Sequence, residues 1–483
     1  MKPYLILSVF LAYTALLFGI TWLTSRKADN ESYYTGNRSS LWYVVAYGMI
    51  GASLSGVTFM SVPGWVGNTG FSYLMVVFGY FFGYLVIAFV LLPVYYRMKL
   101  TSIYTYLESR FGFFSYKSGS VLFLVSRCLG ASLRMFLVVN VLQIFVFESF
   151  GIPFFVTACI FILLVILYTL KGGIKTIIWT DTLQTTFMLL ALFITIFLVI
   201  GQLDMGVGEW FDTIINSKYS YVIVDDWTAR NHWLKQFLSG MFITITMTGL
   251  DQEMMQKNLS CKSLRDAKKN MLVFSVIVVV VNFIFLLLGA TLFLYAQSKN
   301  ISVPALTDDL FPMVSLRFLS PLAGIVFLVG LISAAYPSAD GALTSLTTSF
   351  TIDIFGIQKK NWSEKKKGKV RSIFHVCFAI LLLGLVVMFS EMNDRSVIDK
   401  LFTIAGYTYG PLLGLYAFGL FTKFSIRDIA VPFVAVLSPI LCWLLSENSV
   451  QLLNGYKFGF ELLLINGAIT FIGLLIFSKR KLK

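Results

Sequence analysis

Apolar residues occur along the chain in long segments, and short polar loops separate these segments. Averaged over a window of roughly nineteen residues, the hydropathy predicts about thirteen transmembrane helices. The predicted spans cover residues 4–24, 41–66, 70–95, 119–147, 152–170, 176–201, 233–254, 271–296, 317–345, 371–390, 398–421, 428–446 and 460–478. The predicted fold class is therefore an all-α polytopic membrane protein. Its first segment is expected to be a retained helix, because it lacks the cleavage site of a signal peptide.

Two of these spans carry residues that weaken a helix. Span 41–66 contains Gly51, Gly56, Pro63 and Gly64, and span 233–254 contains Gly240 and Gly249. The two spans are the second and the seventh of the series, so five positions separate them. Inverted repeats of five helices produce this spacing, and they place a binding site where the helices are broken.

The composition excludes several other classes of protein. Hydrophobic residues make up 57% of the 483 residues and charged residues only 13%, against roughly a quarter charged in a soluble domain. The five cysteines have no paired spacing, so neither a disulfide framework nor a zinc site is indicated. The spans contain no Ser/His/Asp set, HExxH motif or phosphate-binding loop, which argues against an enzyme. A channel is disfavoured because interrupted helices in corresponding halves suit a closed central site.

The formal charge of +14 is explained by the loops between the spans. Roughly 27 of the 38 Lys and Arg residues lie in one alternating set of loops, and about nine lie in the opposite set. The positive-inside rule therefore places the N-terminus outside and the C-terminus in the cytoplasm. These basic residues also attract anionic lipid, so no nucleic-acid partner is needed.

Residues 331–355 place a carboxylate, Asp340, and many hydroxyl groups inside a predicted span. A carboxylate at the bilayer centre costs about 2.5 to 3.5 kcal/mol on insertion scales, so it usually faces a pathway or a partner. The alternative is that the hydroxyl residues pack helix against helix and Pro337 only kinks the span.

Four motifs follow one another along the chain. They are GASLSGVTFMSVPG (51–64), GGIKTIIWTDTLQTTFM (172–188), GLDQEMMQKNL (249–259) and AAYPSADGALTSLTTSFTIDIF (334–355). Together they resemble the signature stretches of the sodium:solute symporter family, which includes sodium/proline, sodium/galactose and sodium/sialic acid symporters. The resemblance covers essentially the whole chain and implies a leucine-transporter-like 5+5 inverted-repeat core.

The resemblance also implies how the chain divides. Residues 1–40 form a peripheral first helix and inner loop, 41–201 the first inverted repeat (spans 2–6), 202–232 an extracellular loop, 233–421 the second inverted repeat (spans 7–11), and 422–483 the peripheral spans 12–13 with a basic cytoplasmic tail.

A sodium site between the broken second span and the ninth span is a further implication of the resemblance. Its ligands would be the backbone carbonyls of Gly51, Leu54 and Ala335 and the hydroxyl of Ser338. Oxygen ligands freed by helix unwinding suit a hard cation. Where the family usually has a second hydroxyl after the serine, this chain has Ala339, which leaves the site one ligand short.

Water, Asp340 or Ser55 are candidates to replace the missing ligand; otherwise the site is weaker or proton-coupled. Some relatives have a second sodium site built from two further serines, and the matching positions here are Gly341 and Ala342. One sodium ion is therefore expected. Asp340 is expected to lock the structure, because it lies two residues after Ser338 and projects to another face of the helix.

Asp181 matches the aspartate that the family carries in its sixth span. It is expected on the exit path of sodium, beneath the cation site. The alternative is a structural acid paired with Lys175 or a threonine.

For the substrate, the resemblance points to the break in span 2 and to facing helices, with Ser55, Thr58, Tyr73 and Phe78 as candidates. Arg127 and Arg134 lie seven residues apart, on one helical face of span 119–147. Arg134 is about fifteen residues from the inner loop, roughly 22 Å along a helix, and so past the midplane. It either captures a substrate carboxylate, or it pairs with Asp181 or Asp340, or it extends to the outer interface.

We therefore expect a secondary active transporter that couples inward sodium flow to uptake of a small polar solute (organic anion, amino acid or sugar) by alternating access. Sodium would be co-transported, and the chain would work as a monomer in the cell (inner) membrane, with the lipid bilayer and the solute as its partners. The alternatives are a proton-coupled symporter of the same fold and a non-transporting solute sensor. A fused kinase module is not expected, because the chain ends at Lys483, just past span 13.

Overall fold

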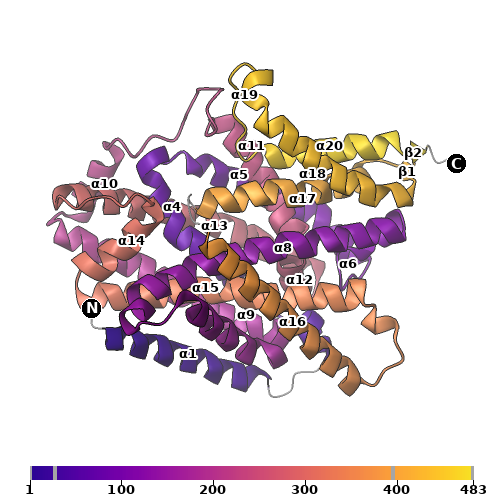
Figure 1. Ribbon diagram of the computed structural model, residues 1–483, viewed down its shortest axis with the longest axis horizontal. Helices are drawn as coiled ribbons and strands as arrows, with labels where there is room; N and C mark the ends of the chain where they lie inside the picture. The colour runs from indigo at the N-terminus through magenta and orange to yellow at the C-terminus, as the bar shows by residue number, and fades with distance from the viewer. Residues whose placement is uncertain (1–2, 26–29, 393–396, 480–483) are drawn as a thin grey trace.

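The computed structural model describes residues 3–25, 30–392 and 397–479, and it is a bundle of helices (Figure 1). The helices are α1 (Pro3–Ser25), α2 (Asn30–Thr35), α3 (Trp42–Ser53), α4 (Gly56–Thr69), α5 (Tyr73–Val86), α6 (Leu92–Arg97), α7 (Thr105–Arg110), α8 (Phe113–Leu142), α9 (Phe154–Gln202), α10 (Val207–Ile215), α11 (Trp233–Thr244), α12 (Gln252–Leu259), α13 (Leu264–Ser298), α14 (Leu310–Met313), α15 (Pro321–Ser349), α16 (Glu364–Ser390), α17 (Val397–Phe421), α18 (Val431–Glu447), α19 (Ser449–Leu452) and α20 (Leu462–Ile476). Within the described residues the only strands are β1 (Ser425–Ile426) and β2 (Ser478–Lys479), which pair antiparallel.

Several helices continue as one turn of π-helix. These turns are Ile87–Leu91 after α5, Gln143–Phe147 after α8, Ile245–Gly249 after α11, Val314–Phe318 after α14 and Phe350–Ile354 after α15. Such π turns are frequent at functional sites in membrane and soluble helices. The turn Ile245–Gly249 is the one that bears on the site described below.

The described helices include eight that are long and apolar enough to cross a membrane, or nine if the bent pair α3 and α4 counts as one span. Two shorter apolar helices cover Phe154–Leu170 and Leu462–Ile476. The chain is therefore a multi-pass helical membrane protein, as the hydropathy predicts. The loop predicted between spans 6 and 7 is not purely irregular, because it contains α10.

Predicted spans 5 and 6 are two helices that meet at a kink at Gly173, and both carry the label α9. Gly173 has φ +53° and ψ −159°, a conformation that residues with a Cβ rarely adopt. A Cβ atom at this position would also lie 2.4 Å from the Cα atom of Tyr33. The glycine thus allows α9 to change direction while the segment after α1 passes close to it.

Helix α15 is the most buried of the long membrane-spanning helices. Every residue from Gly330 to Ser349 is buried, and the helix packs against α9, α8, α16 and α4. Several of its hydroxyl groups bond within the protein: Thr347 Oγ1 donates to the carbonyl of Leu343 at 2.6 Å, and Ser333 Oγ donates to the Tyr13 hydroxyl at 2.7 Å. These bonds satisfy polar groups that have no access to lipid or water.

Candidate functional site

The break predicted in span 2 lies at Leu54 and Ser55, between α3 and α4. Leu54 has φ −87° and ψ 67°, Ser55 is extended, and the axes of α3 and α4 differ by 56°. No described N–H or side-chain donor bonds to the carbonyl oxygens of Gly51 and Leu54. Two of the carbonyls predicted to bind sodium are therefore free of helical hydrogen bonds. Pro63 lies further along, inside the continuous helix α4.

Helix α3, which precedes this break, approaches α9 closely. The Gly51 N–H donates to Thr185 Oγ1 at 2.9 Å, and a Cβ atom at Gly51 would lie 2.6 Å from that oxygen. One turn away, a Cβ atom at Gly48 would lie 3.2 Å from the Cβ atom of Asp181. The glycines of α3 thus bring the broken helix against the face of α9 that carries Asp181.

The other half of the predicted sodium site lies on α15, which contacts both α3 and α4. Ser338 is buried, and its Oγ atom has no hydrogen-bond partner among the described residues. Ala335 is buried one turn earlier, and Ala339 directly follows Ser338. An unpartnered buried hydroxyl is unusual in a native fold, since such groups normally bond to something. Its oxygen suits the ligand role predicted for Ser338.

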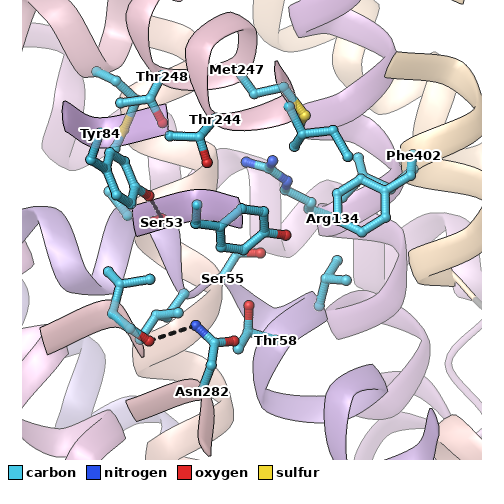
Figure 2. A pocket seen from close by; sticks show the side chains of 18 of the residues that line it. Ser53, Ser55, Thr58, Tyr84, Arg134, Thr244, Met247, Thr248, Asn282 and Phe402 are labelled. Carbon is cyan, nitrogen blue, oxygen red and sulfur yellow. Dashed lines mark hydrogen bonds between the residues drawn. The ribbon is translucent and has the colours of Figure 1, made fainter. Parts of the chain in front are cut away.

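A pocket of about 80 Å³ opens beside the break (Figure 2). Four of the predicted substrate residues line it, namely Ser55, Thr58, Tyr73 and Arg134. Other lining residues that the sequence did not single out are Ser53, Tyr80, Tyr84, Thr244, Met247, Thr248, Asn282 and Phe402. The walls come from α3, α4, α5, α8, α11 with its π turn, α12, α13 and α17.

Phe78 does not reach this pocket. Its side chain is 41% exposed on the outside of α5, where it faces the surroundings of the bundle. The structure therefore does not bring Phe78 to the pocket with the other predicted substrate residues, whereas Tyr73 on the same helix does line it. Phe78 is five residues after Tyr73 on α5. Residues five apart on a helix point in widely different directions, so Phe78 points out of the bundle while Tyr73 points into the pocket.

The two arginines of α8 share the pocket wall but differ in their partners. Arg127 forms an ion pair with Glu253 and lies 3.8 Å from Asp251. Arg134 has no ion pair within the described residues, and its Nε atom is buried without a hydrogen-bond partner. The residue as a whole is half-buried, and its guanidinium faces the pocket beside Thr244 (Figure 2). Pairing of Arg134 with Asp181 or Asp340, one of the predicted alternatives, does not occur.

Four aromatic rings separate the pocket from a larger cavity of about 810 Å³. Tyr73 and Phe402 face the pocket, whereas Trp65 and Phe460 face the larger cavity. Ring centroids are 5.4 Å apart for Trp65 and Tyr73, and 4.6 Å apart for Phe402 and Phe460. Arg230 and Asn231, from the loop predicted to be extracellular, also line the larger cavity. The rings thus form a thin partition on that side.

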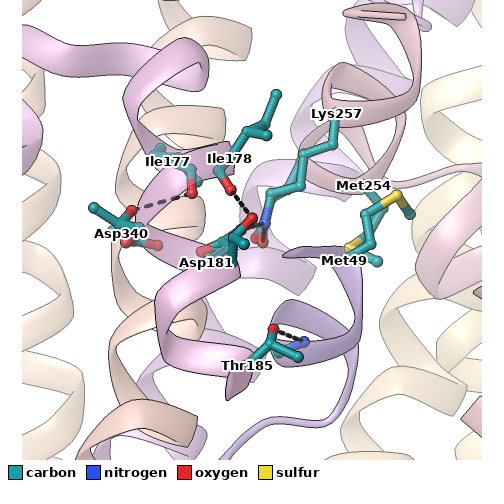
Figure 3. A network of polar contacts seen from close by, with 12 residues as sticks. Met49, Ile177, Ile178, Asp181, Thr185, Met254, Lys257 and Asp340 are labelled. Atoms are coloured by element: carbon teal, nitrogen blue, oxygen red, sulfur yellow. Dashed lines mark hydrogen bonds and ion pairs between the residues drawn. The ribbon is translucent and has the colours of Figure 1, made fainter. Parts of the chain in front are cut away.

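Asp181 lies in a buried network of charges (Figure 3). Its carboxylate is paired with the ammonium group of Lys257 from α12, at 2.7 Å. The predicted alternative was a pair of Asp181 with Lys175 or a threonine. Within the described residues, Asp181 forms neither pair. Asp340, on the other side of Asp181, accepts a hydrogen bond from the Tyr168 hydroxyl at 2.9 Å, which agrees with a structural role for that carboxylate.

Some of the unpredicted lining residues carried a signal in the sequence. Asn282 is a lone amide in an otherwise apolar predicted span, and its Oδ1 atom is buried without a partner; intramembrane polar residues usually mark a pathway or a partner. Thr244 and Thr248 lie one helical turn apart, so they share a face. Phe402 gave no signal, because its aromatic ring resembles the many that face lipid.

The fold and the site define a class of protein. A membrane-spanning bundle with a helix broken at a central pocket is the arrangement of secondary active transporters. The sequence profile of the sodium:solute symporter family matches residues 33–425. The chain therefore belongs to the sodium:solute symporter family. It is a sodium-coupled solute symporter rather than an enzyme, and sodium is the ion that it co-transports.

Curated relatives agree with this assignment. The chain is 25% identical to the sodium/sialic acid symporter SiaT of Proteus mirabilis, over 89% of this chain and 88% of that protein. It is 22% identical to the sodium/sialic acid symporter NanT of Aliivibrio fischeri, over 94% and 89%. It is also 26% identical to the mouse (Mus musculus) sodium-coupled monocarboxylate transporter 1, over 82% of this chain and 65% of that protein.

Solved structures show the same fold. A sodium-coupled sialic acid symporter in a substrate-bound outward-open state superposes with a TM-score of 0.84 at 21% identity, covering 98% of this chain and 99% of that one. The nucleobase-cation-symport-1 transporter MHP1 gives a TM-score of 0.57 at 12% identity, over 93% and 94%.

Proposed function

We propose that this symporter couples inward sodium flow to uptake of a small organic carboxylate by alternating access. The observation that carries the proposal is the unpaired guanidinium of Arg134 in the wall of the pocket. A buried cation without an acceptor is unfavourable, and a carboxylate accepts two parallel hydrogen bonds from a guanidinium. A substrate anion therefore supplies the partner that the fold leaves out.

The charges and the size of the pocket favour this class of substrate. Two arginines and no acidic residue line the pocket, and Arg127 is already neutralised by Glu253. The lining thus gives no carboxylate to an ammonium group, which disfavours an amino acid or an amine. A volume of about 80 Å³ holds roughly six water-sized positions. That space suits a short-chain carboxylate better than a sugar acid.

The polar lining offers further contacts to such a substrate. The Oδ1 atom of Asn282 has no partner, and its amide nitrogen donates to the carbonyl of Val278 at 2.8 Å. This geometry leaves an acceptor for a substrate hydroxyl. The hydroxyls of Ser55 and Thr58, on either side of the start of α4, complete the wall next to the break. A carboxylate that carries a hydroxyl or keto oxygen would use both the Asn282 acceptor and the hydroxyls of Ser55 and Thr58.

The proposed sodium ligands are the carbonyls of Gly51, Leu54 and Ala335 and the hydroxyl of Ser338. Support comes from the two carbonyls freed at the break and from the unpartnered Ser338 Oγ atom. Asp181 is proposed to attract sodium on its way to the inner side. Because Ser55 belongs both to the pocket wall and to the break, solute and ion would stabilise the same conformation of this segment.

For the whole chain we infer about thirteen spans, arranged as two inverted repeats of five with three peripheral helices. The N-terminus lies outside and the C-terminus in the cytoplasm, since the basic loops alternate as the positive-inside rule requires. We also propose that the chain works as a monomer in the cell membrane, since residues of one chain line the pocket.

Uptake into proteoliposomes tests the substrate and the ion together. The solutes compared are a short-chain monocarboxylate, its amide, an amino acid, a hexose and a sialic acid, each with an inward gradient of sodium or of potassium. We expect sodium-driven accumulation of the monocarboxylate, and none of the amide, because the amide lacks the charge that Arg134 binds. Accumulation that ignores sodium and follows a pH gradient would instead establish proton coupling, and binding without uptake would indicate a sensor.

Arg134→Gln tests the role of the arginine directly. Loss of a charge-assisted contact costs about 1.5 to 3 kcal/mol, so the half-saturating carboxylate concentration should rise by roughly 10- to 100-fold. The sodium concentration for half-maximal uptake, extrapolated to saturating solute, should change little. The half-saturating carboxylate concentration of Arg134→Lys should lie between those of Arg134→Gln and the wild type, since an ammonium group keeps the charge but not the planar geometry of the guanidinium. A variant with unchanged solute affinity would exclude Arg134 from the site.

A further inference from the structure

Lys257 and Asp181 form an ion pair that is closed to water. The ammonium nitrogen lies 2.7 Å from Asp181 Oδ2, and the two side chains are 1% and 0% exposed. Lys257 comes from α12, the short helix that follows the π turn of the seventh span, whereas Asp181 lies in the middle of α9. Figure 3 shows the lysine side chain reaching across to the carboxylate. From the sequence, Lys257 counts among the basic loop residues, but its burial gives it another role.

The surroundings hold the lysine in this position. Glu253, one turn earlier on α12, accepts from Lys257 at 3.4 Å and forms an ion pair with Arg127 of α8. Asp251 caps the start of α12 by accepting from the N–H groups of Glu253 and Met254, and it also accepts from the Tyr409 hydroxyl at 2.8 Å. Asp181 and Glu253 thus each have a cationic side chain of the protein within reach.

Gly341 makes room for this arrangement on α15. A Cβ atom at Gly341 would lie 2.2 Å from Glu253 Oε1 and would push the carboxylate away. The space that a side chain at position 341 would take is therefore filled by the acid that holds Lys257. Helix α15 consequently presents no side-chain oxygen from this position to Asp181.

A buried carboxylate strongly favours a cation at its side, because an uncompensated charge in the interior is expensive. An ammonium group at hydrogen-bond distance satisfies that demand as a sodium ion would, and the two cannot occupy one place. Unlike sodium, the ammonium is tethered to the chain and is not carried across the membrane.

We propose that Lys257 is a tethered cation that neutralises Asp181 in place of a transported ion. This inference rests on the proposed sodium-coupled uptake, and it adds the reason for a ratio of one sodium to one solute. Sodium on its inward path meets Asp181 only when Lys257 withdraws with α12. Because Arg127, which lines the pocket, holds Glu253 and thereby Lys257, occupation of the pocket and release of the ion are linked through α12.

The ratio of sodium to solute in the wild type is the first test. Initial fluxes of radiolabelled sodium and of the monocarboxylate are measured in the same proteoliposomes, at zero membrane potential. We expect one sodium per solute. A ratio of two would show that a second ion is carried and would overturn the inference. Wild-type uptake that ignores sodium would overturn the proposed function, and this inference with it.

Three variants at the pair provide the second test. Lys257→Met removes the charge with little loss of volume, so Asp181 is left to recruit an ion from solution. At alkaline pH, where protons compete least, the Hill coefficient for sodium should rise from about one toward two. Lys257→Arg keeps a tethered cation and should retain the wild-type sodium dependence. Lys257→Met combined with Asp181→Asn removes both charges and should return the Hill coefficient to the wild-type value.

A lysine that only stabilised the fold would give a different result. Lys257→Met would then lower the yield or the turnover number but leave the Hill coefficient unchanged, and this outcome would overturn the inference. If Lys257→Met does not fold, the flux ratio of the wild type and the sodium dependence of the Lys257→Arg variant still decide. A changed Hill coefficient in Lys257→Arg contradicts a role that needs only a tethered charge.

Discussion

Ser338 and Ser345 lie on the same buried helix, yet their hydroxyl groups differ. Ser345 Oγ donates to the carbonyl of Ala342 at 3.1 Å, within α15. Ser338 Oγ has no partner. Because a buried hydroxyl normally finds a hydrogen bond, the contrast leaves the Ser338 hydroxyl free for the ligand role proposed for it, as Thr344 Oγ1 is on the same helix.

Replacing Ser338 by alanine is therefore expected to weaken sodium binding. A lost interaction with a charged group costs about 1.5 to 3 kcal/mol, so the sodium concentration for half-maximal uptake should rise at least about tenfold. The maximal rate at saturating sodium should change less. Sodium titration of uptake in proteoliposomes measures both quantities.

Ser345→Ala is the matched control for this change. It removes a hydroxyl from the same helix at the same degree of burial, but one whose bond is internal to α15. Its sodium dependence should equal that of the wild type. A shared shift in both variants would indicate loosening of α15, and an unshifted Ser338→Ala would place the cation elsewhere.

At the scale of single residues, the sequence predicted positions better than partners. Arg127 and Arg134 lie on one face of α8, as their spacing indicates, and Ser55, Thr58 and Tyr73 reach the same pocket. The pairing of Lys257 with Asp181 was not predicted, because 76 positions separate them in the chain. Periodicity fixes which way a side chain points from its own helix, but not which side chain of a distant helix meets it.

At the scale of elements, the packing of α5 on α11 shapes one side of the pocket. A Cβ atom at Gly240 of α11 would lie 2.0 Å from the carbonyl oxygen of Val76, and one at Gly79 of α5 would lie 2.1 Å from that of Phe237. The two helices therefore touch backbone to backbone, as small residues permit in membranes. Tyr80 and Tyr84 on α5 and Thr244 on α11 line the pocket from this contact.

Gly240→Ala is expected to push α5 and α11 apart. Overpacking of a tight contact costs about 1 to 3 kcal/mol, so the melting temperature should fall and the affinity for solute should weaken. Gly384→Ala on α16 is the control, since a Cβ atom there would have no neighbour within 4 Å. Thermal unfolding and solute titration of both variants measure the effect. Equal stability of the two variants would contradict the close contact.

The two glycines that mark span 7 as interrupted, Gly240 and Gly249, have different roles in the structure. The sequence marks Gly240 as a weak point of span 7, but α11 runs through it without interruption. The helix ends instead after the π turn Ile245–Gly249, where Asp251 becomes extended and caps α12. Glycine serves both for helix breaks and for close approach, and one sequence does not distinguish the two uses. Span 2 was predicted correctly because several such residues are clustered there.

At the scale of the whole molecule, the large cavity lies next to the pocket, across the aromatic partition. Thr403 of α17 is exposed and lines the large cavity, next to Phe402 of the aromatic partition. Lys218 is exposed in the loop before α11 and does not line either cavity. Both residues should lie on the outer side if the basic loops face the cytoplasm.

Cysteines at these two positions test topology and alternating access together. In intact cells, a membrane-impermeant maleimide should label both Thr403→Cys and Lys218→Cys, with the wild type as the blank for its five native cysteines. Sodium together with the carboxylate should slow labelling of Thr403→Cys several-fold, because binding favours conformations in which the outer cavity is closed. Labelling of Lys218→Cys should not respond. If both variants are labelled only in inverted vesicles, the predicted orientation of the chain is wrong. If the ligands change the labelling rates of both variants equally, the rate at Thr403→Cys does not report closure of the outer cavity.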